Sequence, residues 1–128
     1  MEQTKKLLLV DDEADFRNII GNFFNRRKIA CETAASCMEA LDWLGKENFD
    51  VVIMDVSMPG LDGLACMAEI KKMWPAIEVI ILTGHVSINS GLIGMKQGAF
   101  DYCLKPVDFD ELLEKVLLAR KTGGMARA

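Results

Sequence analysis

Apolar and polar positions along the chain repeat with two periods, one typical of strands and the other of helices. Three short runs, at residues 7–10, 51–54 and 79–82, are wholly apolar. Such runs favour strands that are buried on both faces of a parallel sheet. Two more mixed segments, residues 29–34 and 100–104, predict a strand at the sheet edge and a last strand.

Between the predicted strands, apolar residues recur every three or four positions, which indicates amphipathic helices. The stripes are Phe16, Ile19, Ile20, Phe23 and Phe24; Cys37, Ala40, Leu41 and Leu44; Leu64, Met67, Ile70 and Trp74; and Phe109, Leu112, Leu113, Val116 and Leu117. Ser36 with Glu39, and Asp108 with Glu111, have the spacing of polar caps that begin helices.

A further helix is expected at residues 87–97, although two glycines lie inside it. Gly91 and Gly94 each cost about 1 kcal/mol relative to alanine in a helix. Two interpretations stay open: the helix is easily remodelled, or the glycines permit close packing.

Five strands that alternate with five helices over short connections predict a doubly wound α/β fold, a three-layer α/β/α sandwich around a five-stranded parallel sheet. We expect one domain over residues 1–122. Gly123 and Gly124 indicate a flexible C-terminal tail over residues 123–128. Periodicity alone does not give the strand order, but it places the carboxyl ends of parallel strands at one edge of the sheet.

Polar side chains follow the predicted strands at that edge: Asp11 and Asp12 after the first, Asp55 after the third, Thr83 after the fourth and Lys105 after the fifth. Carboxylates a few ångströms apart repel one another, so either some are protonated or a cation lies among them. Magnesium takes one or two carboxylates and prefers phosphate oxygens for its other positions. Lysine and threonine suit a phosphoryl group. The grouping therefore predicts magnesium-dependent phosphoryl transfer, with Asp55 as the nucleophile.

Taken singly, each of these residues has a simpler interpretation. Asp11 and Asp12 could form a solvated turn before a helix, where acidic residues favour the helix dipole. Thr83 could belong to a strand-ending turn, and Lys105 could be a surface charge. His85 either orients a water or lies in solvent.

Composition narrows the class of protein. The net charge is −4, which favours neither nucleic acid nor an anionic membrane as a partner. The first apolar run is too short for a signal peptide or a membrane span, so we expect a cytoplasmic protein. The four cysteines, Cys31, Cys37, Cys66 and Cys103, lack zinc-ligand spacing. In a reducing compartment they are predicted to be small apolar packing residues.

The site residues occur together with two turn motifs, Met58-Pro59-Gly60 with Asp62-Gly63, and Lys105-Pro106. This combination resembles the receiver domain of two-component response regulators, from about residue 5 to residue 120. The resemblance implies a flavodoxin-like fold with strand order 2-1-3-4-5. It also implies phosphorylation of Asp55 by a sensor histidine kinase or a phosphotransfer protein.

The resemblance further implies a metal site. Asp12 and Asp55 would ligate Mg²⁺ (or Mn²⁺) directly, together with the backbone carbonyl of Ser57, and Asp11 would act through a bound water. The side chain of Ser57 would flank the phosphoryl group, with a role that the sequence leaves open.

The remaining roles implied by the resemblance concern the switch. Lys105 would pair with the phosphoryl oxygens, Thr83 would turn its hydroxyl towards them, and Tyr102 would be the switch aromatic residue. The bond between Lys105 and Pro106 is often cis in this family.

The function expected from the resemblance is a phosphoprotein switch, with no separate substrate turned over. The fourth helix, fifth strand and fifth helix would form an output face for a downstream effector domain or protein, or for a homodimer. No direct nucleic acid binding is expected of this segment. The alternative is a phosphorylation-independent pseudo-receiver that acts as a dimerisation module, but none of the five site residues is missing.

Two other protein classes fit the sequence less well. A flavodoxin-type electron carrier needs a hydroxyl-rich phosphate loop after the first strand, where this chain is acidic. A haloacid-dehalogenase-like phosphatase expects Asp-x-Asp, where this chain has Asp55-Val56-Ser57.

Overall fold

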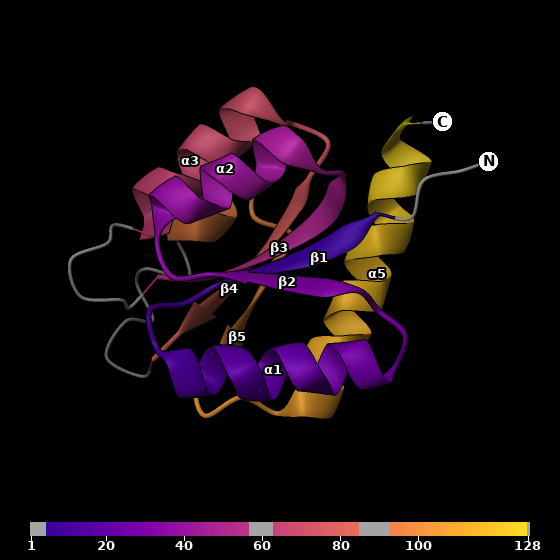
Figure 1. Ribbon diagram of the computed structural model, residues 1–128. Coiled ribbons are helices and arrows are strands. Elements are labelled where there is room, and N and C mark those ends of the chain that lie inside the picture. Colours follow the sequence, from indigo (N-terminus) through magenta and orange to yellow (C-terminus); the bar gives the residue numbers. More distant parts are fainter. Residues whose placement is uncertain (1–4, 57–62, 85–92, 128) are drawn as a thin grey trace.

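The computed structural model describes residues 5–56, 63–84 and 93–127, arranged as a sheet between two layers of helices (Figure 1). In chain order the elements are β1 (Lys6–Val10), α1 (Ala14–Arg26), β2 (Cys31–Ala34), α2 (Cys37–Lys46), β3 (Phe49–Asp55), α3 (Gly63–Met73), β4 (Glu78–Thr83), β5 (Asp101–Leu104) and α5 (Phe109–Arg127). No helix of the described segments is long and apolar enough to cross a membrane.

The five strands form one parallel sheet with the order β2-β1-β3-β4-β5. This confirms the doubly wound fold and the strand order implied by the resemblance. β3 lies at the centre, where Ile53 pairs with Leu9 of β1 and with Ile80 of β4. β2 lies at one edge, as its mixed sequence predicts.

Each face of the sheet has its own hydrophobic core, which explains why the strands are apolar without alternation. Along β1, Leu8 and Val10 pack into the core that contains residues of α2 and α3. Leu7 and Leu9 pack into the core that contains residues of α1 and α5. Figure 1 shows the same division, with α2 and α3 on one side of the sheet and α1 and α5 on the other.

The buried stripes of the helices are narrower than their sequences suggest. In α1, Ile20 and Phe24 are buried, but Ile19 is 53% exposed. Ile19 lies about 100° around the helix axis from Ile20, and so turns away from the sheet. In α5, Val116 is buried, whereas Leu117 is 48% exposed for the same reason.

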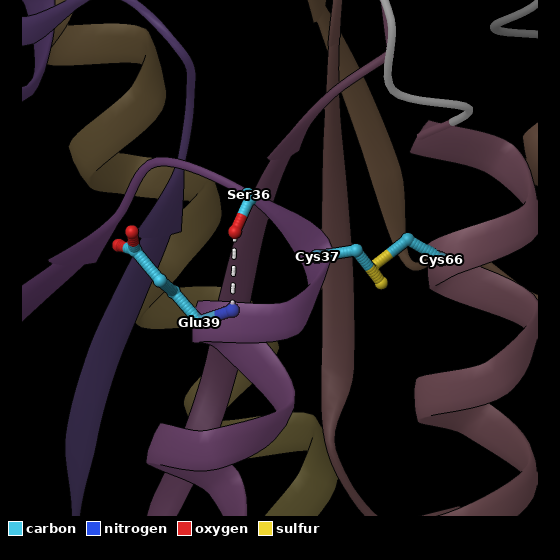
Figure 2. The surroundings of a disulfide bond; sticks show 4 residues. All are labelled: Ser36, Cys37, Glu39 and Cys66. Atoms are coloured by element: carbon cyan, nitrogen blue, oxygen red, sulfur yellow. Dashed lines mark hydrogen bonds between the residues drawn. A yellow bond between two sulfur atoms is a disulfide. The ribbon is translucent and has the colours of Figure 1, made fainter.

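The caps that begin two helices are present as predicted. At the start of α2, the Ser36 hydroxyl oxygen accepts a hydrogen bond of 3.2 Å from the Glu39 backbone N–H (Figure 2). The Glu39 carboxylate in turn accepts one of 2.9 Å from the backbone N–H of Ala35. Before α5, Asp108 Oδ1 accepts a backbone hydrogen bond from Glu111.

The backbone of α5 continues in helical form to Arg127, beyond the paired Gly123 and Gly124. Glycine weakens a helix without breaking it, because it keeps its backbone N–H. The helix therefore extends past residue 122. That residues 123–128 act as a flexible tail stays a prediction.

Part of the helix expected at residues 87–97 lies outside the described residues, including Gly91. Residues 93–96 are helical. A Cβ atom at Gly94 would overlap Cδ1 of Ile81 and lie 3.3 Å from Cδ2 of Leu64. At this position the structure favours the interpretation that glycine permits close packing.

The expectation that all four cysteines are reduced packing residues is wrong for two of them. Cys37 of α2 and Cys66 of α3 form a disulfide bond (Figure 2). Cys31 and Cys103 are buried free thiols, as expected. The pair lies 29 residues apart in sequence, and only the packing of α2 beside α3 brings the two together.

Candidate functional site

The carboxyl ends of the central strands place the expected polar residues at one edge of the sheet. Asp55 is the last residue of β3 and Thr83 is the last residue of β4. Asp11 directly follows β1, and Lys105 directly follows β5. The backbone N–H of Lys105 donates to the carbonyl of Thr83 at 2.8 Å, so the ends of β4 and β5 remain paired up to the site.

Three carboxylates form an acidic cluster at this edge. Asp11, Asp12 and Asp55 each offer a ligand oxygen, and these oxygens all lie within 4.8 Å of one another. Asp11 is 0% exposed and Asp55 is 2% exposed, whereas Asp12 faces solvent. The interpretation of the first two aspartates as a solvated turn is therefore wrong for Asp11.

Asp11 is held in the cluster mainly through its backbone. Its N–H donates to the carbonyl of Ala34 at the end of β2, at 3.0 Å. Its carbonyl accepts a hydrogen bond of 2.8 Å from the guanidinium of Arg17. Its Oδ1 accepts a hydrogen bond of 2.9 Å from the Glu13 backbone N–H.

Arg17 is a site residue that the sequence analysis does not predict. The sequence feature that could have indicated it is a cation in the first half of a helix, where the helix dipole disfavours positive charge.

Lys105 reaches into the acidic cluster. Its Nζ lies 2.5 Å from Oδ2 of Asp55 and 3.7 Å from Oδ2 of Asp11. Nζ also lies 5.2 Å from the centre of the Phe16 ring in α1. The interpretation of Lys105 as a plain surface charge is therefore wrong. The bond between Lys105 and Pro106 is cis, the isomer common in the family that the chain resembles.

Burial and charge shift the protonation of this cluster. Burial, followed by the interaction with the neighbouring Asp55 carboxylate, raises the pKa of Asp11 to about 7, against the opposing effects of the Glu13 N–H and Lys105. Burial lowers the pKa of Lys105, but the hydrogen bond to Asp55 and the charges of Asp55 and Asp11 outweigh it, so that pKa lies above its usual value. One lysine thus faces two buried carboxylates that repel each other.

The donor set fits a hard divalent cation. Asp11 Oδ2 is buried without a hydrogen-bond partner in the described part of the chain, and a buried carboxylate oxygen of this kind is costly unless a cation or a water satisfies it. All three side chains of the cluster offer oxygen ligands, which suit Mg²⁺ or Mn²⁺. Ser57, whose carbonyl is the other expected ligand, lies outside the described residues.

The start of α3 approaches the carboxyl end of β3 closely. A Cβ atom at Gly63 would lie 2.7 Å from the carbonyl oxygen of Asp55 and 2.7 Å from Cα of Val56. Real Cβ atoms do not come this close to backbone, so only glycine fits without a shift. In the sequence, the Asp62-Gly63 pair indicates the turn before the helix. It does not predict that Gly63 lies against the backbone of Asp55.

The two expected switch residues lie on neighbouring strands. Thr83 is fully buried, and its hydroxyl lies 3.4 Å from the carbonyl of Gly84. Tyr102 is half-buried in β5, packs against the core on the α2 and α3 side, and pairs with Ile81 of β4. His85 lies outside the described residues, so its two interpretations remain open.

Comparison with known proteins identifies the family. Residues 7–117 match the family model for the response regulator receiver domain. The chain is 38% identical over 108 residues to the DNA-binding transcriptional regulator NtrC of Klebsiella pneumoniae, covering 84% of this chain and 23% of that protein. It is 39% identical over 110 residues to the transcriptional regulatory protein GlrR of Escherichia coli (strain K12), covering 86% of this chain and 25% of that protein. The chain thus spans about a quarter of the length of these curated relatives.

Solved structures agree with this assignment. A receiver domain protein from Clostridium thermocellum superposes with a TM-score of 0.89 at 35% identity, over 95% of this chain and 98% of that one. NtrX from Brucella abortus superposes with a TM-score of 0.91 at 30% identity, over 98% of this chain and 29% of that one. Sequence, fold and strand-end chemistry lead to one conclusion: the chain belongs to the response regulator receiver domain family.

Proposed function

We propose that the chain is a phosphorylation-controlled switch in which Asp55 accepts a phosphoryl group from the phosphohistidine of a sensor histidine kinase or a phosphotransfer protein. The observation that supports this most directly is the contact of 2.5 Å between Asp55 and Lys105 beside two further carboxylates. A buried nucleophile, a cation and a metal-ligand set are the parts that phosphoryl transfer requires.

In the proposed reaction, a carboxylate oxygen of Asp55 attacks the phosphorus atom in line with the scissile phosphorus–nitrogen bond. An oxygen–phosphorus bond forms, and the histidine nitrogen leaves with the bonding pair. Lys105 moves from Asp55 to the phosphoryl oxygens and offsets their charge. Asp12 and Asp55, with the carbonyl of Ser57 and with Asp11 through a water, would hold Mg²⁺ (or Mn²⁺), which neutralises charge on the phosphoryl group when bound.

The signal would leave the site through Thr83 and Tyr102. A hydroxyl that turns towards the phosphoryl oxygens vacates space in the core, and the half-buried ring of Tyr102 would follow it inwards. The output face then includes a hollow of about 370 Å³ lined by Asp101, Tyr102, Leu104, Pro106, Glu111 and Lys115. Because this hollow includes the switch aromatic residue, its shape would depend on phosphorylation.

We place this switch in the cytoplasm, upstream of an effector domain or an effector protein. Two curated relatives are transcriptional regulators about four times as long as the matched segment, so any contact with nucleic acid would belong to another part of such a protein. A homodimer through the output face is one way to transmit the signal. The chain turns over no separate substrate in this proposal.

Intact-mass measurement after incubation with acetyl phosphate and Mg²⁺ tests the proposal. We expect the natural chain to gain the mass of one phosphoryl group, Asp55→Asn to gain none, and the exposed Asp42→Asn on α2 to behave as the natural chain. An equal adduct on Asp55→Asn would contradict the assignment of the acceptor. No adduct on the natural chain, together with an unchanged oligomeric state, would favour the pseudo-receiver alternative.

A further inference from the structure

The disulfide between Cys37 and Cys66 has no part in phosphoryl transfer as proposed above. It joins the first residue of α2 to the first turn of α3, with a Cα–Cα distance of 5.8 Å (Figure 2). Cys66 is 3% exposed, whereas Cys37 is half-buried at the edge of the core. Of the two residues, Cys37 is therefore the more exposed end of the bond and the better candidate for attack by an external thiol.

The disulfide connects two backbone segments that each hold one side of the acidic cluster. On the α2 side, the carbonyl of Ala34, three residues before Cys37, accepts the hydrogen bond from the backbone of Asp11. On the α3 side, Gly63, three residues before Cys66, packs against the carbonyl oxygen of Asp55. A covalent link between α2 and α3 thus restrains the supports of Asp11 and Asp55 relative to each other.

We propose that Cys37 and Cys66 form a reversible dithiol–disulfide site, and that the disulfide strengthens metal binding by the acidic cluster. The second half of this proposal rests on the metal site of the proposed function. The reacting partner is a small thiol of the glutathione class. In a reducing compartment a disulfide is typically transient and redox-sensing, which suits a bond placed beside a signalling site.

The chemistry is thiol–disulfide exchange. The thiolate of the small thiol attacks Cys37 Sγ, the bond between Cys37 and Cys66 breaks, and Cys66 leaves with the electron pair and takes a proton. A second small thiolate attacks the small-thiol sulfur of the mixed disulfide, and Cys37 leaves as a thiolate. In total, two thiols and the protein disulfide give one small-molecule disulfide and the protein dithiol, a two-electron reduction of the chain.

The position of Cys37 supports the second step. Cys37 is the first residue of α2, directly after the cap residue Ser36. A helix N-terminus stabilises a thiolate there, which makes Cys37 a good leaving group and a good attacking group in the reverse reaction. The other two cysteines differ, because burial raises the pKa of Cys31 to about 12 and that of Cys103 to about 11.

The direction of the effect on metal binding follows from preorganisation. A cation draws Asp11, Asp12 and Asp55 together, and the segments that hold them lose freedom when it binds. The disulfide removes part of that freedom beforehand, so less is lost on binding and affinity rises. Linkage then requires that saturating metal favours the disulfide over the dithiol by the same factor.

The first test measures the redox site directly. The chain is equilibrated in glutathione buffers of graded poise, quenched with acid, labelled with a thiol reagent and weighed. We expect two labels to disappear together in one two-electron transition, in the natural chain and in Cys31→Ala with Cys103→Ala. Cys37→Ser is expected to lack this transition. Persistence of both labels at every poise would overturn the proposal.

The second test measures Mg²⁺ binding by calorimetry in the oxidised and reduced states. We expect binding to be about fivefold tighter in the oxidised state. Saturating Mg²⁺ should shift the glutathione equilibrium by that same factor. Cys37→Ser, which replaces a half-buried residue by a polar one of similar size, should bind Mg²⁺ as the reduced chain does in both buffers. Equal affinities in the two states, including no binding in either, would overturn the effect on metal.

Neither measurement requires phosphoryl transfer. Failure of Asp55 to gain a phosphoryl group would therefore contradict the proposed function while leaving both redox tests decisive. Conversely, a chain that is phosphorylated normally, but whose cysteines never pair, would contradict only the redox proposal.

Discussion

At the scale of single residues, the site holds more buried negative charge than its lysine can neutralise. Asp11 and Asp55 are buried and share one lysine. Removing or protonating one of these three side chains changes the electrostatic energy of the other two, because buried charges interact strongly and are poorly screened. The titration of Asp11, and substitutions of Lys105 and of the neighbouring Gly63, should each have an effect that can be measured.

The raised pKa of Asp11 predicts a pH-dependent stability. Its pKa is about 7 in the metal-free folded chain, compared with the ordinary aspartate value of 3.8 that applies to the unfolded chain. Between these values the folded chain keeps a proton that the unfolded chain has lost, so the contribution of Asp11 to stability falls as pH rises from about 4 to about 7. Urea unfolding across this range should show the fall in the natural chain and a flatter profile in Asp11→Asn. A profile that is identical in the two would contradict the burial of an ionisable Asp11.

Removal of Lys105 should slow phosphorylation. Lys105→Met removes the cation next to Asp55, the carboxylate that we propose as the nucleophile, and loss of one such electrostatic contact typically slows a reaction by about 100-fold. The rate with acetyl phosphate and Mg²⁺, followed by intact mass, measures the effect. Lys71→Met is the matched control, because Lys71 is also half-buried and paired with an acid, Glu78 at 3.7 Å, away from the site. Equal rates for Lys105→Met and the natural chain would refute the role of Lys105.

Gly63→Ala should destabilise the chain, because its Cβ would lie 2.7 Å from backbone atoms of Asp55 and Val56. Relief requires α3 to move away from β3, which typically costs about 1–3 kcal/mol. Gly45→Ala in α2 is the control, since its Cβ meets nothing within 4 Å, and it should gain about 1 kcal/mol of helix propensity. Urea midpoints that move in the same direction for both would disprove the close contact.

At the scale of elements, the helices are attached to the sheet by cores and by a few directed ion pairs. α5 spans residues Phe109–Arg127, and Arg120 within it holds Asp50 at the start of β3. The two hydrogen bonds measure 2.6 Å and 3.0 Å, a bidentate pair between residues 70 positions apart. This attachment lies at the opposite end of β3 from Asp55.

Arg120→Met should lower the free energy of unfolding by about 1 kcal/mol, because a partly exposed bidentate pair is stronger than a surface pair but screened by solvent. A double-mutant cycle with Asp50→Asn should recover a coupling energy of similar size. The exposed neighbour Lys121→Met serves as the control and should change stability little. A coupling energy near zero would mean that α5 is held by its apolar contacts alone.

At the scale of the whole molecule, one covalent bond crosses between elements that the sheet already organises. The disulfide closes a segment of 29 residues that includes all of β3. Chain-entropy arguments assign about 3.6 kcal/mol of stability to a loop of this length. The stabilisation comes mainly from the unfolded chain, whose freedom the bond restricts.

Reduction should therefore shift the urea midpoint downwards by an amount equivalent to about 3.6 kcal/mol. Unfolding curves of the oxidised chain, the reduced chain and Cys37→Ser measure this, with the variant expected to match the reduced chain. Cys31→Ala in both redox states controls for the reagent. A midpoint that does not respond to reduction would show that the bond does not persist in the unfolded chain or does not form.

The sequence by itself determined the class of fold and the edge at which the chemistry lies. Unbroken apolar runs require strands covered on both faces, and alternation with helical stripes requires parallel strands, whose carboxyl ends meet. The positions of Asp11, Asp55, Thr83 and Lys105 at that edge followed directly. Their agreement with a known family, rather than periodicity, supplied the strand order and the roles of individual residues.

Only the tertiary structure decided the relations between elements distant in sequence. Arg17 holding the Asp11 carbonyl, Gly63 against the Asp55 backbone and the bond between Cys37 and Cys66 depend on how helices are set on the sheet. Local patterns carry periodicity and propensity, but the distance between two helices is set by packing on a shared surface. The pairing of two scattered cysteines was therefore invisible until α2 and α3 lay side by side.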